Sequence, residues 1–264
     1  MNTNSYTTVK LAKGEIYLYD FGDIRLHAYK TDDPLSDEVF IVEKDGKAVI
    51  IESPCFFDNE RALSEYLEKF EVEGMLVAYH AAGAKFMQNV KKYGTLSAKE
   101  YGERGGGKAL IDNFTKAFGF TFDRTVHNIT EFLSAGKTTI AGIDFVITPN
   151  NEAFDIELPE INVVYTHMLG HDCHSIVANA AHADAVISQL GTYIDKGVNL
   201  VLSSHYTPED LSDVKAKIEY LKDIKSTAAS VKTADEFKNA IKEKYPYYGG
   251  ENYLDMTAAM FFNK

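Results

Sequence analysis

The sequence predicts a protein of mixed α/β class, α+β in its strand order, built as a four-layer αββα sandwich. Two observations predict this fold. The expected strands come in hairpin runs, and each half of the chain places its strands before its helices. A doubly wound parallel sheet would instead alternate single strands with helices. Since no Pro/Ser-rich linker divides the chain, we expect a single domain over residues 1–264.

The first half begins with strands rich in β-branched and aromatic residues. They are Glu15–Asp20, Ile24–Lys30, Glu38–Glu43 and Lys47–Glu52. Asp45-Gly46 predicts a type I′ hairpin, because both turn residues need positive φ. Apolar residues at helical spacing from Leu63 to Phe70 predict a helix. The uninterrupted apolar run Met75–Tyr79 then predicts a strand buried on both faces, which ends at His80.

The middle of the chain, Ser97–Gly119, is expected to be helical with a break at Gly105–Gly107. A second run of strands follows, at Ile129–Leu133, Lys137–Ala141, Asp144–Thr148, Phe154–Leu158, Ile161–Tyr165 and, after one helix, Val198–Ser203. Thr207 and Pro208 predict the N-cap and first position of the next helix. Thr233 and Glu236 form a predicted capping box for another helix.

Composition narrows the class of partners. The chain has 39 acidic and 27 basic residues and a net charge of −12, which disfavours nucleic acid and anionic membranes. Two cysteines cannot form a disulfide framework, and both are expected to stay reduced. No signal peptide and no apolar run of about 20 residues is visible, so we expect a cytoplasmic protein that binds a small molecule. The sequence does not indicate an oligomeric state.

Histidines carry the chemical information. His80, His167 and His205 each follow an apolar strand, and side chains at strand ends of layered folds converge on a cleft. Imidazole is the commonest metal ligand at neutral pH, so separate strand ends can share one ion. A hydrogen-bonded structural role is the alternative for each histidine. His27, His127 and His182 are expected to be structural or exposed.

Several motifs resemble the metallo-β-lactamase superfamily. LVAYHAAGAK stands where the family has its His-x-His-x-Asp-His motif, and SSHYTP is similar to the strand end that carries the last histidine. The later half is most similar to the alkyl sulfatase branch, through the turn Thr148–Ala153 and through Pro159–His167 followed by His171 and His174. The resemblance implies the αββα fold and a metal-dependent reaction.

The departures from this pattern change the implied site. With His80 on the first histidine, Ala82, Ala84 and Lys85 replace the remaining motif residues, so the second metal position of the family is lost. The resemblance implies one divalent ion, Zn²⁺, Fe²⁺ or Mn²⁺, with four ligands: His80, Glu152, His167 and His205. For Glu152, a solvated turn acid is the alternative.

Three further residues are expected to act in catalysis. Lys85 would hold an anion or act as a base, and the alternative is a surface lysine. His171 and His174 would face the substrate or orient a ligand, and the alternative is a polar helix N-terminus. Two functions follow as hypotheses. The first is a metal-dependent hydrolase-like enzyme, and the second is a degenerate relative that binds a small molecule or a protein without catalysis.

Overall fold

The computed structural model describes residues 5–262, so residues 1–4 and 263–264 of the expected domain lie outside the described residues. The chain forms two compact units. The first unit comprises Met1–Met168 and Asn199–Pro208, and it contains both sheets up to Pro208. The second comprises Leu169–Val198 and Glu209–Lys264, and it is mostly helical.

The first sheet is formed by the N-terminal half of the chain, in the order β1 to β8. Its strands are β1 (Thr7–Lys10), β2 (Glu15–Asp20), β3 (Ile24–Lys30), β4 (Glu38–Lys44), β5 (Lys47–Ile51), β6 (Glu71–Leu76), β7 (Lys92–Gly94) and β8 (Glu131–Phe132). The first five form an antiparallel meander, and the pairs from β5 to β8 are parallel. The β4–β5 turn has φ of 53° at Asp45 and 78° at Gly46, which confirms the predicted hairpin.

The second sheet has the order β14-β13-β12-β11-β10-β9. Its strands are β9 (Gly136–Ile140), β10 (Ile143–Pro149), β11 (Phe154–Leu158), β12 (Val163–Thr166), β13 (Leu200–Ser203) and β14 (Tyr206–Glu209). Strands β9 to β12 pair antiparallel, whereas β12 and β13 pair parallel. The other predicted strands of this half are therefore confirmed, with ends that shift by at most two residues, and β14 is an addition. The strand predicted over Ile129–Leu133 is β8, which belongs to the first sheet.

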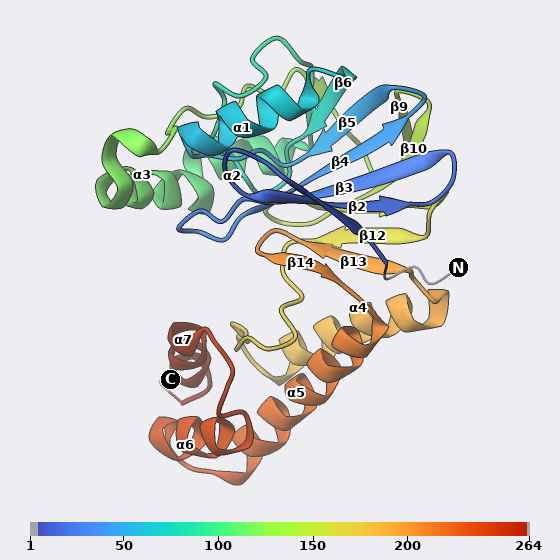
Figure 1. The fold of residues 1–264 in the computed structure, drawn as a ribbon. Helices are drawn as coiled ribbons and strands as arrows, with labels where there is room; N and C mark the ends of the chain where they lie inside the picture. Colours follow the sequence, from blue (N-terminus) through green and yellow to red (C-terminus); the bar gives the residue numbers. More distant parts are fainter. Residues whose placement is uncertain (1–4, 263–264) are drawn as a thin grey trace. The chain divides into compact units, whose positions relative to one another are not determined.

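The two sheets pack face to face over one apolar core. Phe40, Val42 and Leu76 of the first sheet share this core with Phe145 and Ile156 of the second. The other face of the first sheet packs against α1 (Phe57–Leu67), where Ile41 and Val39 contact the cluster that contains Leu63 (Figure 1). Successive residues of β4 thus enter opposite cores, which explains the uninterrupted apolar run from Val39 to Val42 in this strand.

Two helices follow β7 in the first unit. They are α2 (Leu96–Arg104) and α3 (Gly106–Phe118), followed by the 3₁₀ turn η1 (Gly119–Thr121). The predicted glycine break is confirmed, since Gly105 ends α2 and donates its backbone N–H to the carbonyls of Glu100 and Tyr101. Phe114 and Phe118 of α3 pack against Phe56 and Phe122, and this aromatic cluster anchors the helix.

The second unit contains α4 (Ala180–Lys196), α5 (Leu211–Ser230), α6 (Ala234–Lys244) and α7 (Glu251–Phe262). The capping box of Thr233 and Glu236 at α6 is confirmed. The predicted cap of α5 is wrong, because Asp210 and not Thr207 is its N-cap. Pro208 instead lies in β14 at the sheet edge, where a missing N–H is tolerated.

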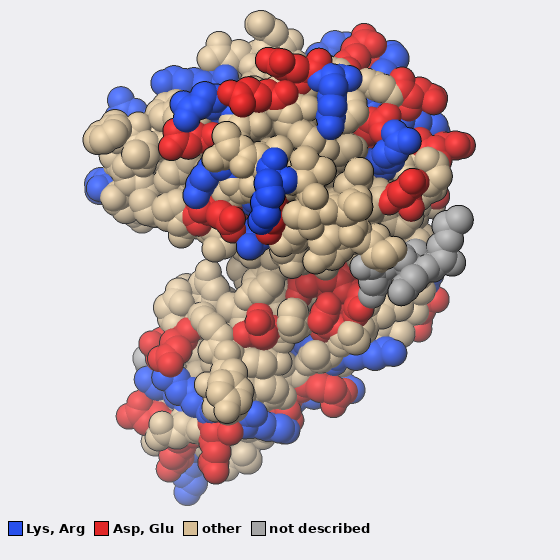
Figure 2. All heavy atoms as spheres, in the orientation of Figure 1, with Lys and Arg blue, Asp and Glu red and all other residues tan. Residues whose placement is uncertain are grey.

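No helix within residues 5–262 combines the length and apolarity that a membrane span needs. On the face drawn in Figure 2, basic and acidic side chains are interspersed. Exposed ion pairs within one helix, such as Arg104 with Glu100 in α2, contribute little to stability.

Candidate metal centre

Three predicted histidines come together in the first unit. His80 follows β6, His167 follows β12 and His205 follows β13. The ring centroids of His80 and His205 are 5.8 Å apart, and those of His167 and His205 are 5.4 Å apart. Strand ends from both sheets therefore present imidazoles to one region of the unit.

A buried carboxylate joins them. Asp37, in the loop before β4, places its Oδ1 3.3 Å from His205 Nδ1 and 3.9 Å from His80 Nε2. One ligand atom from each of these three residues lies within 4.8 Å of the others. Two ligands bound about 2.0–2.1 Å from a tetrahedral ion are themselves roughly 3.4 Å apart. The Asp37–His205 distance of 3.3 Å is close to this value and the Asp37–His80 distance of 3.9 Å is somewhat longer. Binding of an ion would therefore need only a small movement of these side chains.

Two nitrogen atoms at this centre have no hydrogen-bond partner within the described residues. They are His80 Nε2 and His205 Nδ1, and both are buried. Buried polar atoms are nearly always paired, because an unpaired one costs about 1–3 kcal/mol. Imidazole nitrogen and carboxylate oxygen are also the donors that Zn²⁺, Fe²⁺ and Mn²⁺ accept. The residues present therefore fit a divalent ion.

Glu52 holds the backbone that carries His80. This fully buried residue follows β5, and its Oε2 accepts N–H bonds from Ala78 at 3.3 Å and His80 at 2.9 Å. Its Oε1 accepts from the N–H of Tyr79 at 2.8 Å and from the Tyr165 hydroxyl. The strand predicted over Met75–Tyr79 is instead Glu71–Leu76. The N–H of Val77 still bonds to the Tyr93 carbonyl, and the backbone donors from Ala78 onward turn toward this carboxylate.

The His80 ring is oriented by a second contact. Its Nδ1 lies 3.2 Å from the carbonyl oxygen of Ser53, and donation there leaves Nε2 as the atom that faces Asp37. Burial alone would lower the pKa of His80, but the negative charges of Asp37 and Glu52 outweigh it and raise this pKa. Burial opposes ionisation of Asp37 as well, yet His80 and His205 hold its pKa below the usual value.

His167 is a neutral neighbour of this group. Its ring stacks on Tyr79 with centroids 4.4 Å apart, and its Nδ1 lies 3.1 Å from Ser204 Oγ. Burial, together with the nearby His205 and His80, lowers the pKa of His167 to about 3. Ser204 Oγ is 2.7 Å from the Tyr165 hydroxyl, so hydrogen bonds connect His167 back to Glu52.

Glu152 and Lys85 lie elsewhere in the first unit. Glu152 is exposed in the turn before β11, and its N–H donates to Asn150 Oδ1. Lys85 is exposed, with its backbone N–H on Asp123 Oδ2 and its ammonium 4.8 Å from the centre of the Phe57 ring. The acid beside the histidines is thus Asp37, which no local sequence signal separates from an ordinary turn acid.

His171 and His174 belong to the second unit. His171 Nδ1 is 2.8 Å from Glu209 Oε1, and although burial opposes it, this carboxylate raises the pKa of His171. His174 is buried, with its Nδ1 3.1 Å from the Tyr220 hydroxyl, and burial lowers its pKa. Both histidines connect the segment before α4 to α5, His171 through Asp213 and His174 through Tyr220.

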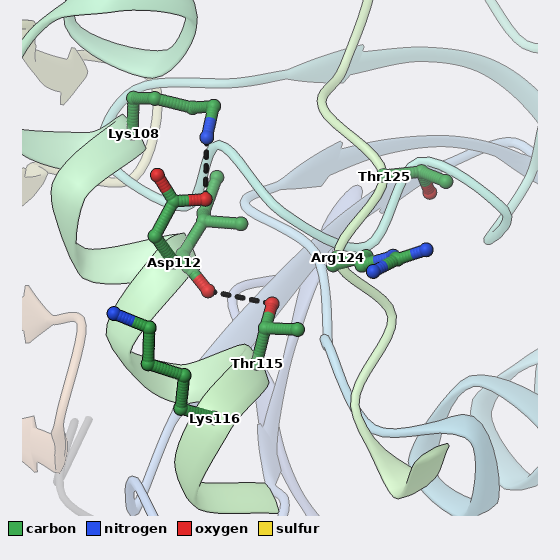
Figure 3. Close-up of a pocket in the computed structure, with 7 residues that line it drawn as sticks. Lys108, Asp112, Thr115, Lys116, Arg124 and Thr125 are labelled. Carbon is green, nitrogen blue, oxygen red and sulfur yellow. Dashed lines mark hydrogen bonds and ion pairs between the residues drawn. The ribbon is translucent and has the colours of Figure 1, made fainter. Parts of the chain in front are cut away.

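Two hollows of the first unit lie away from the histidines. One of about 570 Å³ lies between α3 and the segment at Arg124 (Figure 3). Most of its lining residues are charged, and Lys108 there is paired with Asp112 of the same helix. A second hollow of similar volume includes Lys85 and Phe57. The metal centre is therefore identified by its donor atoms and not by the volume of a hollow.

Comparison with known proteins shows similarity in structure only. No protein-family model and no curated protein matches the chain. A stereoselective inverting sec-alkylsulfatase from Pseudomonas sp. is 14% identical with a TM-score of 0.65, over 95% of this chain and 50% of that one. A double mutant of a sec-alkyl sulfatase gives 14% identity and a TM-score of 0.67, over 94% and 49%.

A metallo-β-lactamase family protein from Thermus thermophilus is 13% identical with a TM-score of 0.59, over 90% of this chain and 91% of that one. The chain spans about half the length of the alkyl sulfatase chains it matches. At these identities the likeness establishes a fold and not an activity. Together with the two sheets packed over one core, it shows that the chain has the metallo-β-lactamase fold, as its motifs predicted.

Proposed function

We propose that this protein is a metal-dependent, hydrolase-like enzyme that acts on a small molecule. One divalent ion, Zn²⁺, Fe²⁺ or Mn²⁺, would be held by Asp37, His80 and His205. The observation that carries the proposal is the pair of buried, unpartnered imidazole nitrogens beside one carboxylate. Asp37 replaces Glu152 in this ligand set because it is buried within reach of both histidines. The fold shared with metallo-β-lactamase proteins and alkyl sulfatases supports it.

A divalent ion bound here would lower the pKa of a bound water to about 7 and polarise the scissile group. The protein's own residues supply position and proton handling. Glu52 and Ser53 fix the backbone and tautomer of His80. His167 is neutral at physiological pH, and its Ser204 contact engages Nδ1, which leaves Nε2 to accept a proton or contact substrate.

A non-catalytic binding protein is the second candidate. It is favoured by Ala82 and Ala84, which carry no donor where the family motif has a histidine and an aspartate. The two candidates differ in metal content. A hydrolase-like enzyme requires a stoichiometric ion, whereas a protein that has lost this chemistry does not.

The test is elemental analysis of the protein after expression with supplemented Zn²⁺, Fe²⁺ and Mn²⁺. We expect at least one ion per chain in the native protein and the loss of this ion in Asp37→Asn, His80→Ala and His205→Ala. His182→Ala, which changes an exposed histidine of α4, is the matched control and should retain the ion. Native protein that lacks metal and melts at an unchanged temperature with each ion would refute the enzyme and support the binding protein.

Substrate class is addressed with the metal-loaded protein. A secondary alkyl sulfate and a β-lactam are the first compounds to assay, since similar structures are of proteins named for these activities. Turnover that is lost in His205→Ala and kept in His182→Ala would connect the chemistry to this centre.

A further inference from the structure

Asp37 presents its two carboxylate oxygens to two different groups of side chains. Oδ1 faces His80 and His205, as described above. Oδ2 accepts a hydrogen bond from the thiol of Cys55, with Sγ 3.2 Å away. Asp33 completes this second group, and one ligand atom from each of Asp33, Asp37 and Cys55 lies within 4.8 Å of the others. One carboxylate is therefore common to two sets of potential metal ligands.

We propose that Asp33, Asp37 and Cys55 form a second cation site, in which Asp37 bridges to the ion held by His80 and His205. This inference goes beyond the proposed function and shares only Asp37 with it. The ligands differ from those of the second metal position in the family motif, where this chain has Ala82, Ala84 and Lys85.

Burial and missing partners support the site. The exposed fractions of Asp33, Asp37 and Cys55 are 7%, 4% and 5%. Asp33 Oδ1 accepts the N–H groups of Leu35 and Asp37, whereas its Oδ2 is buried with no partner among the described residues. Burying a carboxylate oxygen without a partner costs free energy, and a bound cation offsets more of this cost than any other partner.

Charge supports it as well. Asp33 and Asp37 are adjacent buried acids, and within residues 5–262 neither forms an ion pair with Lys or Arg. The pair therefore lacks a compensating positive charge on its Cys55 side. A proton shared between the acids is the competing explanation, and it predicts no metal at this position.

The ligand types select the ion. One thiolate with two carboxylates suits Zn²⁺, and Co²⁺ is a spectroscopic substitute for it. Binding requires that Cys55 loses the proton it now donates to Asp37, and this proton leaves to solvent. Each ion bound at this position should thus release one proton from the thiol.

The experiment is a Co²⁺ titration of the full-length, metal-free protein followed by absorption in the near ultraviolet. We expect two Co²⁺ per chain and a thiolate-to-cobalt charge-transfer band. Cys55→Ser should lose the band and one Co²⁺, and Asp33→Asn should weaken the band-forming step at least tenfold. Cys173→Ser, which removes the other buried cysteine, is the matched control and should keep the band and both ions.

The two proposals fail in different ways. Binding of a single Co²⁺ without a thiolate band would overturn the second site and leave the histidine site intact. In His205→Ala, a retained band with one fewer Co²⁺ would support two separate positions. No binding of Co²⁺ to the native protein would overturn both. Proton release that is equal in the native protein and in Cys55→Ser would count against the thiolate ligand, even if Cys55→Ser is less stable.

Discussion

Substitution of Glu52 tests how the backbone that carries His80 is held in place. Its side chain accepts three backbone N–H groups, those of Ala78, Tyr79 and His80, and the hydroxyl of Tyr165. Glu52→Gln preserves the volume but replaces one acceptor oxygen with a donor. An NH₂ group at Oε2 would face two N–H groups. At Oε1 it would face one N–H group, because the Tyr165 hydroxyl can turn toward Ser204.

The better of these orientations leaves one buried N–H unpaired, which costs about 1–3 kcal/mol. Glu52→Ala leaves all three unpaired, so we expect a loss of about 3 kcal/mol or more. Urea unfolding followed by circular dichroism measures both values, and Glu65→Gln on an exposed position of α1 is the control. A Glu52→Gln variant within about 0.5 kcal/mol of the native protein would show that this carboxylate does not hold the strand end.

Three further predictions concern pH, backbone conformation and metal. Burial raises the pKa of Glu60 to about 8, so the folded state holds the extra proton between pH 4.5 and 8 and stability falls as pH rises through this range. In Glu60→Gln, the free energy of unfolding should fall less between pH 5 and pH 8. An equal decrease in the variant and the native protein would contradict this reasoning. Gly46→Ala should destabilise by roughly 1 kcal/mol, because its φ is +78°, whereas Gly191→Ala inside α4 should stabilise by up to about 1 kcal/mol in the same denaturation assay. Equal effects of the two substitutions would contradict this. A chelator should lower the melting temperature of the metal-loaded protein, since an ion at 100 times its Kd stabilises by about 2.7 kcal/mol, and the decrease should be smaller in His205→Ala, which lacks the histidine-bound ion. The same chelator shift in both proteins would argue against the histidine centre.

Local signals predicted much of the fold. Strands β2, β3 and β11 begin and end where the sequence patterns place them, because alternating or apolar runs and turn residues act over a few positions. The cap of α5 was misplaced, since Thr207-Pro208 suits an edge strand as well as a helix start. Short β1 and β7 were missed because few residues carry their pattern.

The site divides in the same way. The positions of His80, His167 and His205 after apolar strands predicted their convergence, because strand ends of the two packed sheets meet at the same edge of the layered fold. Asp37 escaped prediction, since its turn is separated from every histidine in the chain and resembles other acidic turns. Lys85 and Glu152 follow family motifs in sequence, yet both side chains are exposed in the structure.

Local sequence signals are enough to predict most of the strands, the β4–β5 hairpin, the α6 cap and the three histidines at strand ends. Each depends on a residue and its near neighbours, through φ preference, periodicity or the position of a side chain after a strand. The position of Asp37 beside the histidines and the bonds of Glu52 to the loop of His80 depend on tertiary packing. Those contacts join residues from separate loops, and their distances follow from how the two sheets pack together.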